Sequence, residues 1–365
     1  MTRPPRVSVL LAVHNGADYV AQAIESILAQ TFSDFELLVV DDASTDDTPA
    51  CIAPFEDARI RIVRNETNLG LTRSLNRGLA LAHAPLIARQ DADDRSHADR
   101  LAKQVAFLDA NPDVAVVGAQ ACYIDARGHR IGVSPWPKST GALAIRWQLL
   151  FDGPFVHTSV MFRTAIVRDE LGGYDERFVT SQDFELWSRV GGKGHVMRNL
   201  AETLVDFRIH GQSTSARYGL EGIQRVAPVV RENVVRELGA DVLPEGWPDA
   251  WIRLTNPQVF PASGDEWRTV ARAIEAIHRA FVRKYPDARS DDEIDRHLSS
   301  MFIRVAQWGA ARRRLASAGC FLRAARLNFR LALGALPRSV GHWVLRRRGS
   351  SARLIAAPAP RPKGR

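Results

Sequence analysis

The chain has 365 residues, of which 45% are hydrophobic and 25% charged, and its formal net charge is +8. These values are ordinary for a globular protein and leave room for one large domain with an appendage, or for two domains. The cysteines Cys51, Cys122 and Cys320 are scattered without CxxC spacing, so they predict neither a disulfide framework nor a zinc site. No run approaches the roughly 18 apolar residues of a membrane-spanning helix.

The charge is divided unevenly along the chain. From Met301 to Arg365 there are 14 Arg, one Lys and no Asp or Glu, whereas the first 300 residues carry a net charge of −7. A basic block of this kind binds an anionic partner or is a solvated tail. Nucleic acid and the anionic leaflet of a membrane are the two anionic partners to consider.

Strand and helix patterns alternate over the first 120 residues. Continuous apolar runs predict strands buried on both faces, and apolar residues three or four positions apart predict helices. The predicted strands are Val7–Val13, Phe35–Val40, Arg59–Val63, Pro85–Ala88 and Val114–Gly118. The predicted helices are Tyr19–Gln30, Leu71–Ala82 and Ala98–Leu108, with a short helix capped by Ser44 or Thr45 after the second strand. This alternation predicts an α/β fold in which helices flank a mostly parallel sheet.

The remainder of the chain is mixed and then helical. We expect a hairpin turn over Asp125–Gly128, a strand over Thr158–Phe162 and a helix over Asp183–Val190. Beyond Tyr218 the pattern is mostly helical, interrupted by a proline-rich connector over Pro244–Pro261. The N-terminal run is followed by no clean cleavage pattern, so it predicts a strand rather than a signal peptide. With the scattered cysteines, this favours a cytoplasmic location.

Carboxylates follow two of the predicted strands. Asp41 and Asp42 end the second strand, and Asp91, Asp93 and Asp94 follow the fourth. Because ligands bind at the carboxyl ends of parallel strands, these side chains are candidates for one site. Two carboxylates suit Mg²⁺ or Mn²⁺, which keeps open positions for phosphate oxygens. For the second cluster alone, capping of the helix near Ala98 is an equally good explanation.

Several segments together resemble the family 2 glycosyltransferases of GT-A fold. They are, in order, VSVLLAVHNGADYVAQAIESILAQTFSDFELLVVDDASTDDT, NLGLTRSLNRGLALAHAPLIARQDADD, FVHTSVMFR, GGYDERF, SQDFELWSRV and FRIHGQSTS. The resemblance covers roughly residues 6–216. It implies a GT-A catalytic domain over residues 1–216, and the pattern and charge of the remaining sequence predict a helical region over 217–345 and a basic, disordered tail over 346–365.

The resemblance also implies roles for individual residues. Asp183 matches the catalytic carboxylate that takes the proton of the acceptor hydroxyl. Asp93 matches the last Asp of the family's Asp-x-Asp motif, which holds the metal on the donor diphosphate, and His210 matches a histidine near the diphosphate or metal. The nucleotide would be bound by Ala12, Val13, His14, Asn15, Asp42 and Asp91. The cofactor would be Mn²⁺ or Mg²⁺.

The implied reaction moves one sugar from a UDP-, dTDP- or GDP-sugar to a hydroxyl acceptor. A single carboxylate base with direct attack inverts the anomeric centre, since no second carboxylate nucleophile is needed. Gln182 departs from the family, which usually has Glu there. The Gln-x-x-Arg-Trp motif of processive synthases is missing: Leu143–Trp147 resembles it but has Leu first and precedes Asp183. Transfer of a single sugar, in cell-envelope or exopolysaccharide synthesis on a glycan or lipid-linked acceptor, is therefore the expectation.

Some of these residues also have structural explanations. Taken alone, Asp183 is better explained as a first-turn carboxylate favoured by the helix dipole, and only the upstream motifs favour the catalytic role. His14 and His157 suit either the site or the core. Trp187 fits the core better than a sugar-stacking platform. In the tail, Leu322, Ala325, Phe329, Leu333 and Leu336 have helical spacing beside arginines, which fits either a packed helical hairpin or attachment to the inner face of the plasma membrane.

Other functions remain as alternatives. A non-catalytic nucleotide-sugar-binding protein would have no use for a base at Asp183. An Asp-dependent phosphohydrolase is suggested by Asp91-x-Asp93, but Arg95 stands where that class expects a hydroxyl residue. A dinucleotide-dependent oxidoreductase is disfavoured because AVHNGADYV lacks a glycine-rich phosphate loop. We expect no nucleic acid partner.

Overall fold

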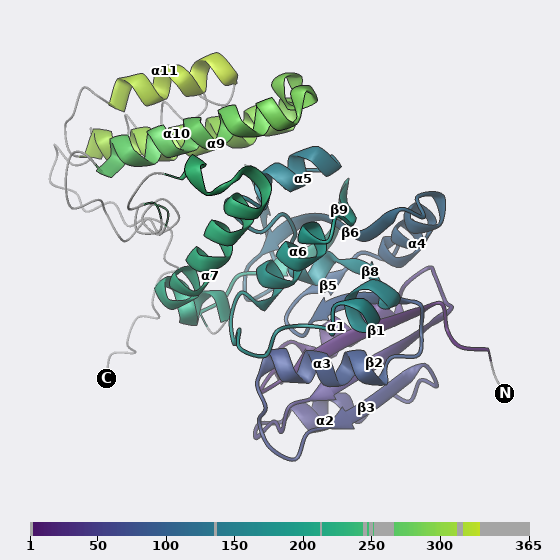
Figure 1. The fold of residues 1–365 in the computed structure, drawn as a ribbon. Helices are drawn as coiled ribbons and strands as arrows, with labels where there is room; N and C mark the ends of the chain where they lie inside the picture. The colour runs from purple at the N-terminus through teal and green to yellow at the C-terminus, as the bar shows by residue number, and fades with distance from the viewer. Residues whose placement is uncertain are drawn as a thin grey trace, which may run out of the picture.

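The computed structural model describes residues 3–134, 137–211, 214–243, 247, 251, 266–311 and 317–328. Within these residues nine strands form one sheet, in the order β3-β2-β1-β4-β8-β6-β9-β5, with β7 paired to β6 (Figure 1). Strands β3, β2, β1 and β4 are parallel, and β6 and β9 are also parallel to each other. The strands are β1 Val7–Val13, β2 Phe35–Asp41, β3 Ile60–Arg64, β4 Leu86–Asp91, β5 Arg95–Ser96, β6 Val114–Ile124, β7 Arg130–Val133, β8 Met161–Arg163 and β9 Val196–Arg208.

Helices cover both faces of the sheet. All seven residues of β1 are buried, and its alternate side chains belong to two different cores. Val9 and Leu11 pack in one core with α1 and α4, whereas Leu10 packs in the other with α3. The longer helices are α1 Val20–Leu28, α2 Thr48–Ile52, α3 Leu71–Leu81, α4 Arg100–Ala110, α5 Ala142–Gln148, α6 Gln182–Gly192, α7 Thr214–Leu238, α9 Glu266–Lys284, α10 Asp292–Ala311 and α11 Ser317–Leu327.

The predicted α/β class, mostly parallel sheet and helical C-terminal region are confirmed. The predicted strand over Thr158–Phe162 is partly wrong, because a single helical turn, η1 (His157–Ser159), precedes the short β8. Ser44 and Thr45 do not cap α2; the Asp46 carboxylate accepts the Thr48 N–H instead, at 3.0 Å. Strand β9 was not predicted.

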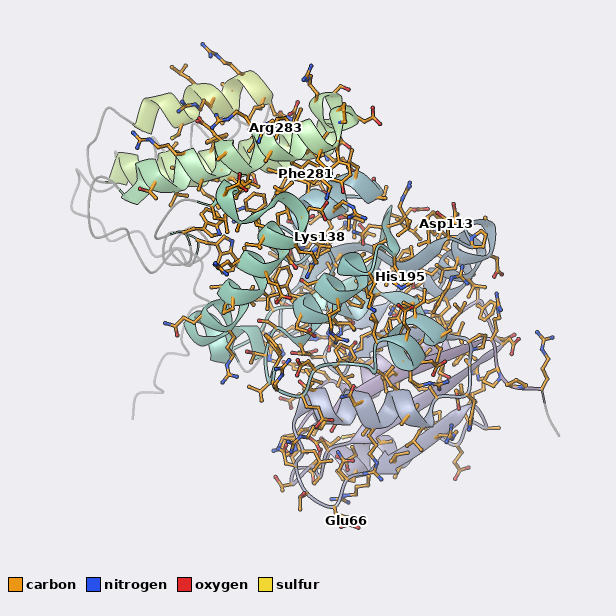
Figure 2. All side chains as sticks on the ribbon, viewed as in Figure 1. Glu66, Asp113, Lys138, His195, Phe281 and Arg283 are labelled. Carbon is orange, nitrogen blue, oxygen red and sulfur yellow. The ribbon has the colours of Figure 1, made fainter. Side chains whose placement is uncertain are left out.

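The helical C-terminal region packs against the sheet through α5. Trp147 of α5 is fully buried and meets the Phe281 ring of α9 edge-on, with 5.3 Å between ring centroids. Glu293 of α10 accepts the N–H groups of Thr140 and Gly141, at the start of α5, at 2.9 and 2.8 Å. Figure 2 shows Phe281 at this junction.

The predicted domain boundary at residues 216–217 falls inside α7, which begins at Thr214. The division into domains stays a prediction. The proline-rich connector lies outside the described residues apart from Trp247 and Trp251, and so does the tail from residue 329 onward, including Phe329, Leu333 and Leu336. Among the described residues, no helix combines the length and hydropathy needed to cross a bilayer.

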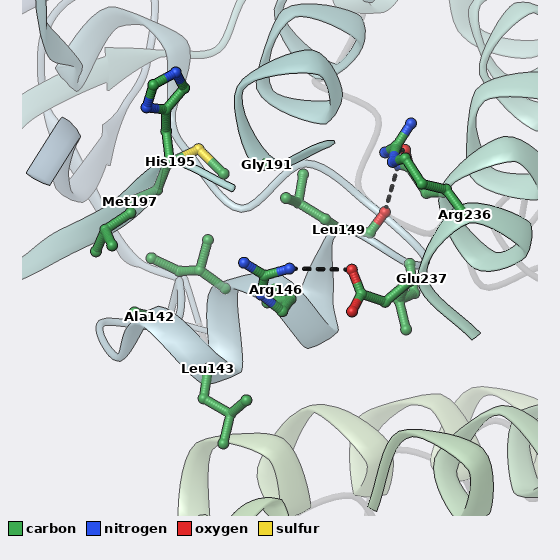
Figure 3. A pocket seen from close by; sticks show the side chains of 13 residues that line it. Ala142, Leu143, Arg146, Leu149, Gly191, His195, Met197, Arg236 and Glu237 are labelled. Carbon is green, nitrogen blue, oxygen red and sulfur yellow. Dashed lines mark hydrogen bonds and ion pairs between the residues drawn. The ribbon is translucent and has the colours of Figure 1, made fainter. Parts of the chain in front are cut away.

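A cavity of about 170 Å³ lies where α5, the end of α6, the start of β9 and the end of α7 meet (Figure 3). Arg146 pairs with Glu237 across it at 3.1 Å. None of the predicted site residues lines this cavity. The pair of Arg146 and Glu237 joins α5 to α7.

Candidate active site

The carboxyl ends of β2, β1 and β4 lie side by side, as parallel pairing requires. Ala12 is opposite Asp91 in the register, and Val13 is opposite Asp41. A cavity of about 900 Å³ opens at this edge. It is lined by every residue predicted to bind nucleotide or metal: Ala12, Val13, His14, Asn15, Asp42, Asp91, Asp93 and His210. Asp183 does not line it, and the individual roles of all these residues stay predictions.

The loop after β1 is tied to the loop after β2. Asn15 has φ 53°, in the left-handed region that asparagine tolerates, and its side-chain oxygen accepts the Thr45 N–H at 2.8 Å. The Asn15 N–H in turn donates to Ser44 Oγ at 3.0 Å. His14 is exposed, and its Nδ1 lies 2.8 Å from the Asp42 carbonyl oxygen. This wall of the cavity is therefore built without a ligand.

Asp42 is buried and holds a third loop against the cavity. Its Oδ1 accepts the Asn65 amide at 2.5 Å and the Leu69 N–H at 2.8 Å, and its Oδ2 accepts the Gly70 N–H at 2.8 Å. A carboxylate has about four acceptor sites, so three of them are used by the protein itself. Asp42 thus shapes the nucleotide side of the cavity as well as lining it.

Two buried arginines reduce the repulsion within the Asp91–Asp94 cluster. Arg89, fully buried on β4, donates to Asp91 Oδ1 at 2.5 Å. Arg208 of β9 donates from its backbone N–H to Asp94 Oδ1 at 2.7 Å and from Nε to the Asp93 carbonyl at 2.8 Å. Burial, and next the charges of Asp91 and Asp93, raise the pKa of Asp94 well above its ordinary value. This shift favours the protonated form of Asp94 and so lessens the repulsion within the cluster.

The alternative that this cluster caps the following helix is wrong. Helix α4 begins only at Arg100, with Asp99 in the flanking position. Asp94 instead accepts the Arg208 N–H, and Asp93 pairs with His210, whose Nε2 lies 2.8 Å from Asp93 Oδ2. The cluster is therefore bonded to β9 through Arg208, and its members Asp91 and Asp93 line the cavity.

Asp93 and His210 are the pair that fits a divalent cation. No three His, Cys, Asp or Glu side chains converge as metal ligands within the described part of the chain. Mg²⁺ and related ions, however, are often held by one or two protein ligands while substrate phosphates and water complete the shell. The donor set suits a cation that arrives with a diphosphate.

Asp183 is the second residue of α6, two positions after Ser181, which flanks the helix and has φ 58°. Its side chain makes no hydrogen bond or ion pair with any residue that the structure describes, so it does not cap the helix. Its charge acts on the partly buried His157 and on the buried Tyr174, on which Asp91 also acts. Asp183 is thus linked to the site through His157 and Tyr174, and its carboxylate has no partner among the described residues.

Sequence analysis missed three residues of the site. Arg89 and Arg208 hold the turn that carries Asp91, Asp93 and Asp94. Tyr19 lines the cavity. The Arg208 guanidinium lies 4.4 Å from the centroid of the Tyr19 ring, and the centroids of the Tyr19 and His210 rings are 5.1 Å apart. Arg89 had a signal, because Arg89 and Asp91 are two apart on a strand and share a face. Tyr19 and Arg208 had none.

Comparison with known proteins identifies the family. The model of "Glycosyl transferase family 2" matches residues 8–171. The chain is 33% identical over 218 residues to the O-antigen biosynthesis glycosyltransferase WbnJ of Escherichia coli, an alignment that covers 57% of this chain and 81% of WbnJ.

Solved structures of glycosyltransferases share the fold. S. aureus TarS, residues 1–349, in complex with UDP-GlcNAc superimposes with a TM-score of 0.54 at 17% identity, over 95% of this chain and 93% of that one. The mannosyltransferase PcManGT of Pyrobaculum calidifontis, in complex with GDP-Man and Mn²⁺, gives a TM-score of 0.50 at 17% identity, over 93% and 88% of the two chains. With the sheet, its acidic strand ends and the family match together, this chain belongs to glycosyl transferase family 2 and is a glycosyltransferase of GT-A fold.

Proposed function

We propose that this glycosyltransferase transfers one sugar, with inversion, from a nucleoside diphosphate sugar to a hydroxyl acceptor. The observation that carries the proposal is a cavity lined by the loops after β1 and β2 and by Asp93, together with the unpaired carboxylate of Asp183, which lies outside the lining and acts on the same His157–Tyr174 pair as Asp91 does. The cavity is large enough for a nucleotide, and the two structural neighbours were solved with UDP-GlcNAc and with GDP-Man and Mn²⁺.

In the proposed step, Asp183 accepts the proton of the acceptor hydroxyl as that oxygen forms a bond to C1 of the donor sugar. The bond between C1 and the diphosphate oxygen breaks on the opposite face, and its electron pair leaves with the nucleoside diphosphate. Asp93 and His210 would hold Mn²⁺ or Mg²⁺, which stabilises the charge on the leaving diphosphate. The other groups bind and orient: Arg89 fixes Asp91, and Asp42 fixes the loop around Gly70.

The structure also favours transfer of one sugar over polymer synthesis. The Leu143–Trp147 segment, which resembles part of the processive motif, lies in α5. There Trp147 is fully buried and Arg146 pairs with Glu237 of α7. The Trp147 side chain is therefore not available to a growing glycan, and the Arg146 guanidinium is held by an ion pair. WbnJ acts in O-antigen synthesis by name, which supports an acceptor in polysaccharide assembly, either a glycan or a lipid-linked one.

The phosphohydrolase alternative finds no support. Such an enzyme needs a free aspartate nucleophile, whereas the Asp91 carboxylate is paired with a buried arginine at 2.5 Å. A non-catalytic sugar-nucleotide binder differs from the proposed enzyme only at Asp183. The discriminating experiment therefore changes that residue.

The first test is a thermal-shift panel of UDP, GDP, dTDP and CDP, each with Mn²⁺ or with EDTA. We expect one diphosphate to stabilise the protein only with Mn²⁺, and Asp93→Ala to abolish the shift. Turnover of the matching nucleotide sugar is then measured for Asp183→Asn, with Asp113→Asn, an exposed carboxylate far from the site (Figure 2), as the control. Loss of a general base predicts a rate lower by about 10²–10⁴-fold for Asp183→Asn. Unchanged turnover would exclude the base, and no shift with any diphosphate would exclude the proposal.

A cytoplasmic location at the inner face of the plasma membrane is proposed from the basic end of the chain, which carries +15 from Met301 onward. Flotation with anionic vesicles tests it, using the full chain and a chain that ends at Asn328. Binding that requires the tail would support the proposal. Equal recovery of both proteins from anionic and neutral vesicles would refute it.

A further inference from the structure

One helical turn, η1, connects the donor side of the site to the base. The Asp91 N–H donates to Thr158 Oγ1 at 3.0 Å, which ties η1 to the end of β4. Ser159 Oγ contacts both the N–H and the carbonyl of Ala119 on β6, at 3.0 and 3.1 Å. Thr158 and Ser159 are fully buried. The third residue of this turn, His157, is therefore carried by a rigid support.

The His157 ring is held by residues from two other segments. Its Nε2 lies 2.9 Å from the Tyr174 hydroxyl. Tyr174 is itself clamped, because its backbone N–H and carbonyl both bond the Asn76 side-chain amide of α3 at 2.8 Å. Trp187, one turn after Asp183 on α6, meets the imidazole at 66° with 6.4 Å between centroids. The ring thus has one fixed orientation.

The second nitrogen of this ring has no partner in the described protein. No hydrogen bond joins His157 Nδ1 to any described residue. The atom is not among the buried polar atoms that lack partners, and His157 is only partly buried, although it is not among the lining residues of the 900 Å³ cavity, so solvent can reach the atom. A histidine whose one nitrogen is anchored and whose other is open is built to make one further hydrogen bond.

Contacts link His157 to both halves of the site, because the neighbouring Thr158 is bonded to the Asp91 N–H and Trp187, which meets the His157 ring, lies one turn after Asp183 on α6. The imidazole is within electrostatic reach of Asp91, on the donor side, and of Asp183, the proposed base. Burial and then the charge of Arg89 lower the pKa of His157, while the two carboxylates oppose the shift. At neutral pH the ring is uncharged, so it suits a neutral polar group.

The chemistry of the transfer determines which group arrives there. The diphosphate binds at the Asp91–Asp93 end, and Asp183 must face the acceptor oxygen that attacks C1. The transferred sugar therefore lies between these carboxylates, on the same side as His157. Resting on the proposed function, we infer that His157 Nδ1 binds a hydroxyl of the transferred sugar, with Tyr174 fixing the ring for that contact.

Two variants separate this contact from a structural role. The amide of asparagine reproduces the position of Nδ1, and the longer amide of glutamine reproduces that of Nε2. His157→Asn keeps a polar atom for the sugar, whereas His157→Gln keeps the contact with Tyr174. The probes are UDP, UDP-GlcNAc, GDP and GDP-mannose with Mn²⁺, and Kd is measured for the wild-type protein, both variants and the exposed control His129→Gln.

We expect UDP or GDP to bind all four proteins equally. The matching nucleotide sugar should bind about tenfold more weakly to His157→Gln than to the wild type, the loss of one neutral hydrogen bond. His157→Asn should recover most of that loss, and His129→Gln should show none. Tyr174→Phe, which frees the ring without changing its polarity, should lie between these limits.

The inference is overturned if His157→Gln binds the nucleotide sugar as well as His157→Asn does. It is also overturned if both variants lose affinity for the bare diphosphate, which would indicate a structural role, or if the wild type binds no sugar nucleotide more tightly than its diphosphate. Failure of the proposed function has a different signature, because then no diphosphate binds the wild-type protein with Mn²⁺, and the inference falls with it.

Discussion

The attachment of α10 to α5 gives a quantitative prediction for Glu293→Ala. The Glu293 carboxylate accepts the N–H groups of Thr140 and Gly141 and, at 2.7 Å, the Thr140 hydroxyl. A single hydrogen bond to a charged group makes a net contribution of about 1.5–3 kcal/mol to the free energy of unfolding. Because the three bonds share one partly buried side chain, we expect about 3 kcal/mol in all. With an unfolding entropy of about 2.1 cal/mol/K per residue over roughly 300 residues, this lowers Tm by roughly 5 °C.

The assay is thermal unfolding followed by tryptophan fluorescence, since Trp147 lies in α5 against α9. Glu293→Gln, which keeps one acceptor oxygen, should lie midway. The matched control is Asp292→Ala, an exposed carboxylate in the same first turn of α10, which should change Tm by about 1 °C or less. If Glu293→Ala and Asp292→Ala unfold at the same temperature, the reasoning is refuted, because the carboxylate would then contribute nothing beyond its helix-end charge.

Three other substitutions test the site and its surroundings. Asp42→Asn should weaken binding of the nucleoside diphosphate about tenfold, because the Leu69 and Gly70 N–H groups bond different carboxylate oxygens and the asparagine amide keeps only one of these acceptors; unchanged Kd in calorimetry would contradict this. Arg89→Met should cost about 3 kcal/mol in urea unfolding, because it leaves Asp91 without its buried partner, and an unchanged midpoint would show that the pair is dispensable. Although burial opposes it, the hydrogen bond and charge of His297 hold the pKa of Asp152 well below its ordinary value. A carboxylate whose pKa is lower in the folded protein than in the unfolded chain stabilises the fold at pH values above its unfolded-chain pKa. The loss of Tm caused by Asp152→Asn should therefore be full at pH 7 and shrink as the pH falls from about 5 toward 3. A loss of Tm that does not change with pH would contradict the pairing.

The parts of the fold that could be predicted are those whose sequence pattern has one explanation. Val7–Val13 is apolar at every position because both faces of β1 are covered, and such a run is a strand by length and composition. Strand β9 was not predicted from the sequence. It lies between β6 and β5, and β5 has only two residues, so most of one side of β9 has no paired strand. Much of β9 is therefore partly exposed, its pairing with β6 is interrupted by bulges, and its sequence lacks a clear period.

Local side-chain bonding explains the error at residues 158–162. Ser159 Oγ bonds the Val156 carbonyl at 2.8 Å, so a hydroxyl competes with the sheet and bends the chain into η1. The gathering of residues at the strand ends was predictable, because parallel strands end at one edge. The pairing of His157 with Tyr174 beside Asp183 was not, because three separate segments supply these side chains and no local pattern relates them.

The loops around the nucleotide end of the cavity are bonded to one another before any ligand arrives. Besides the contacts of Asn15, the Gly16 N–H donates to Thr48 Oγ1 at 2.8 Å, and the Ala17 N–H donates to Asp46 at 3.2 Å. A binding site that is already ordered loses little conformational entropy on association. Its apparent affinity is also not reduced by having only a small fraction of the protein in the conformation that binds the ligand. The nucleoside portion of a donor should therefore bind with a small entropic penalty and at a rate set by diffusion and orientation rather than by loop closure.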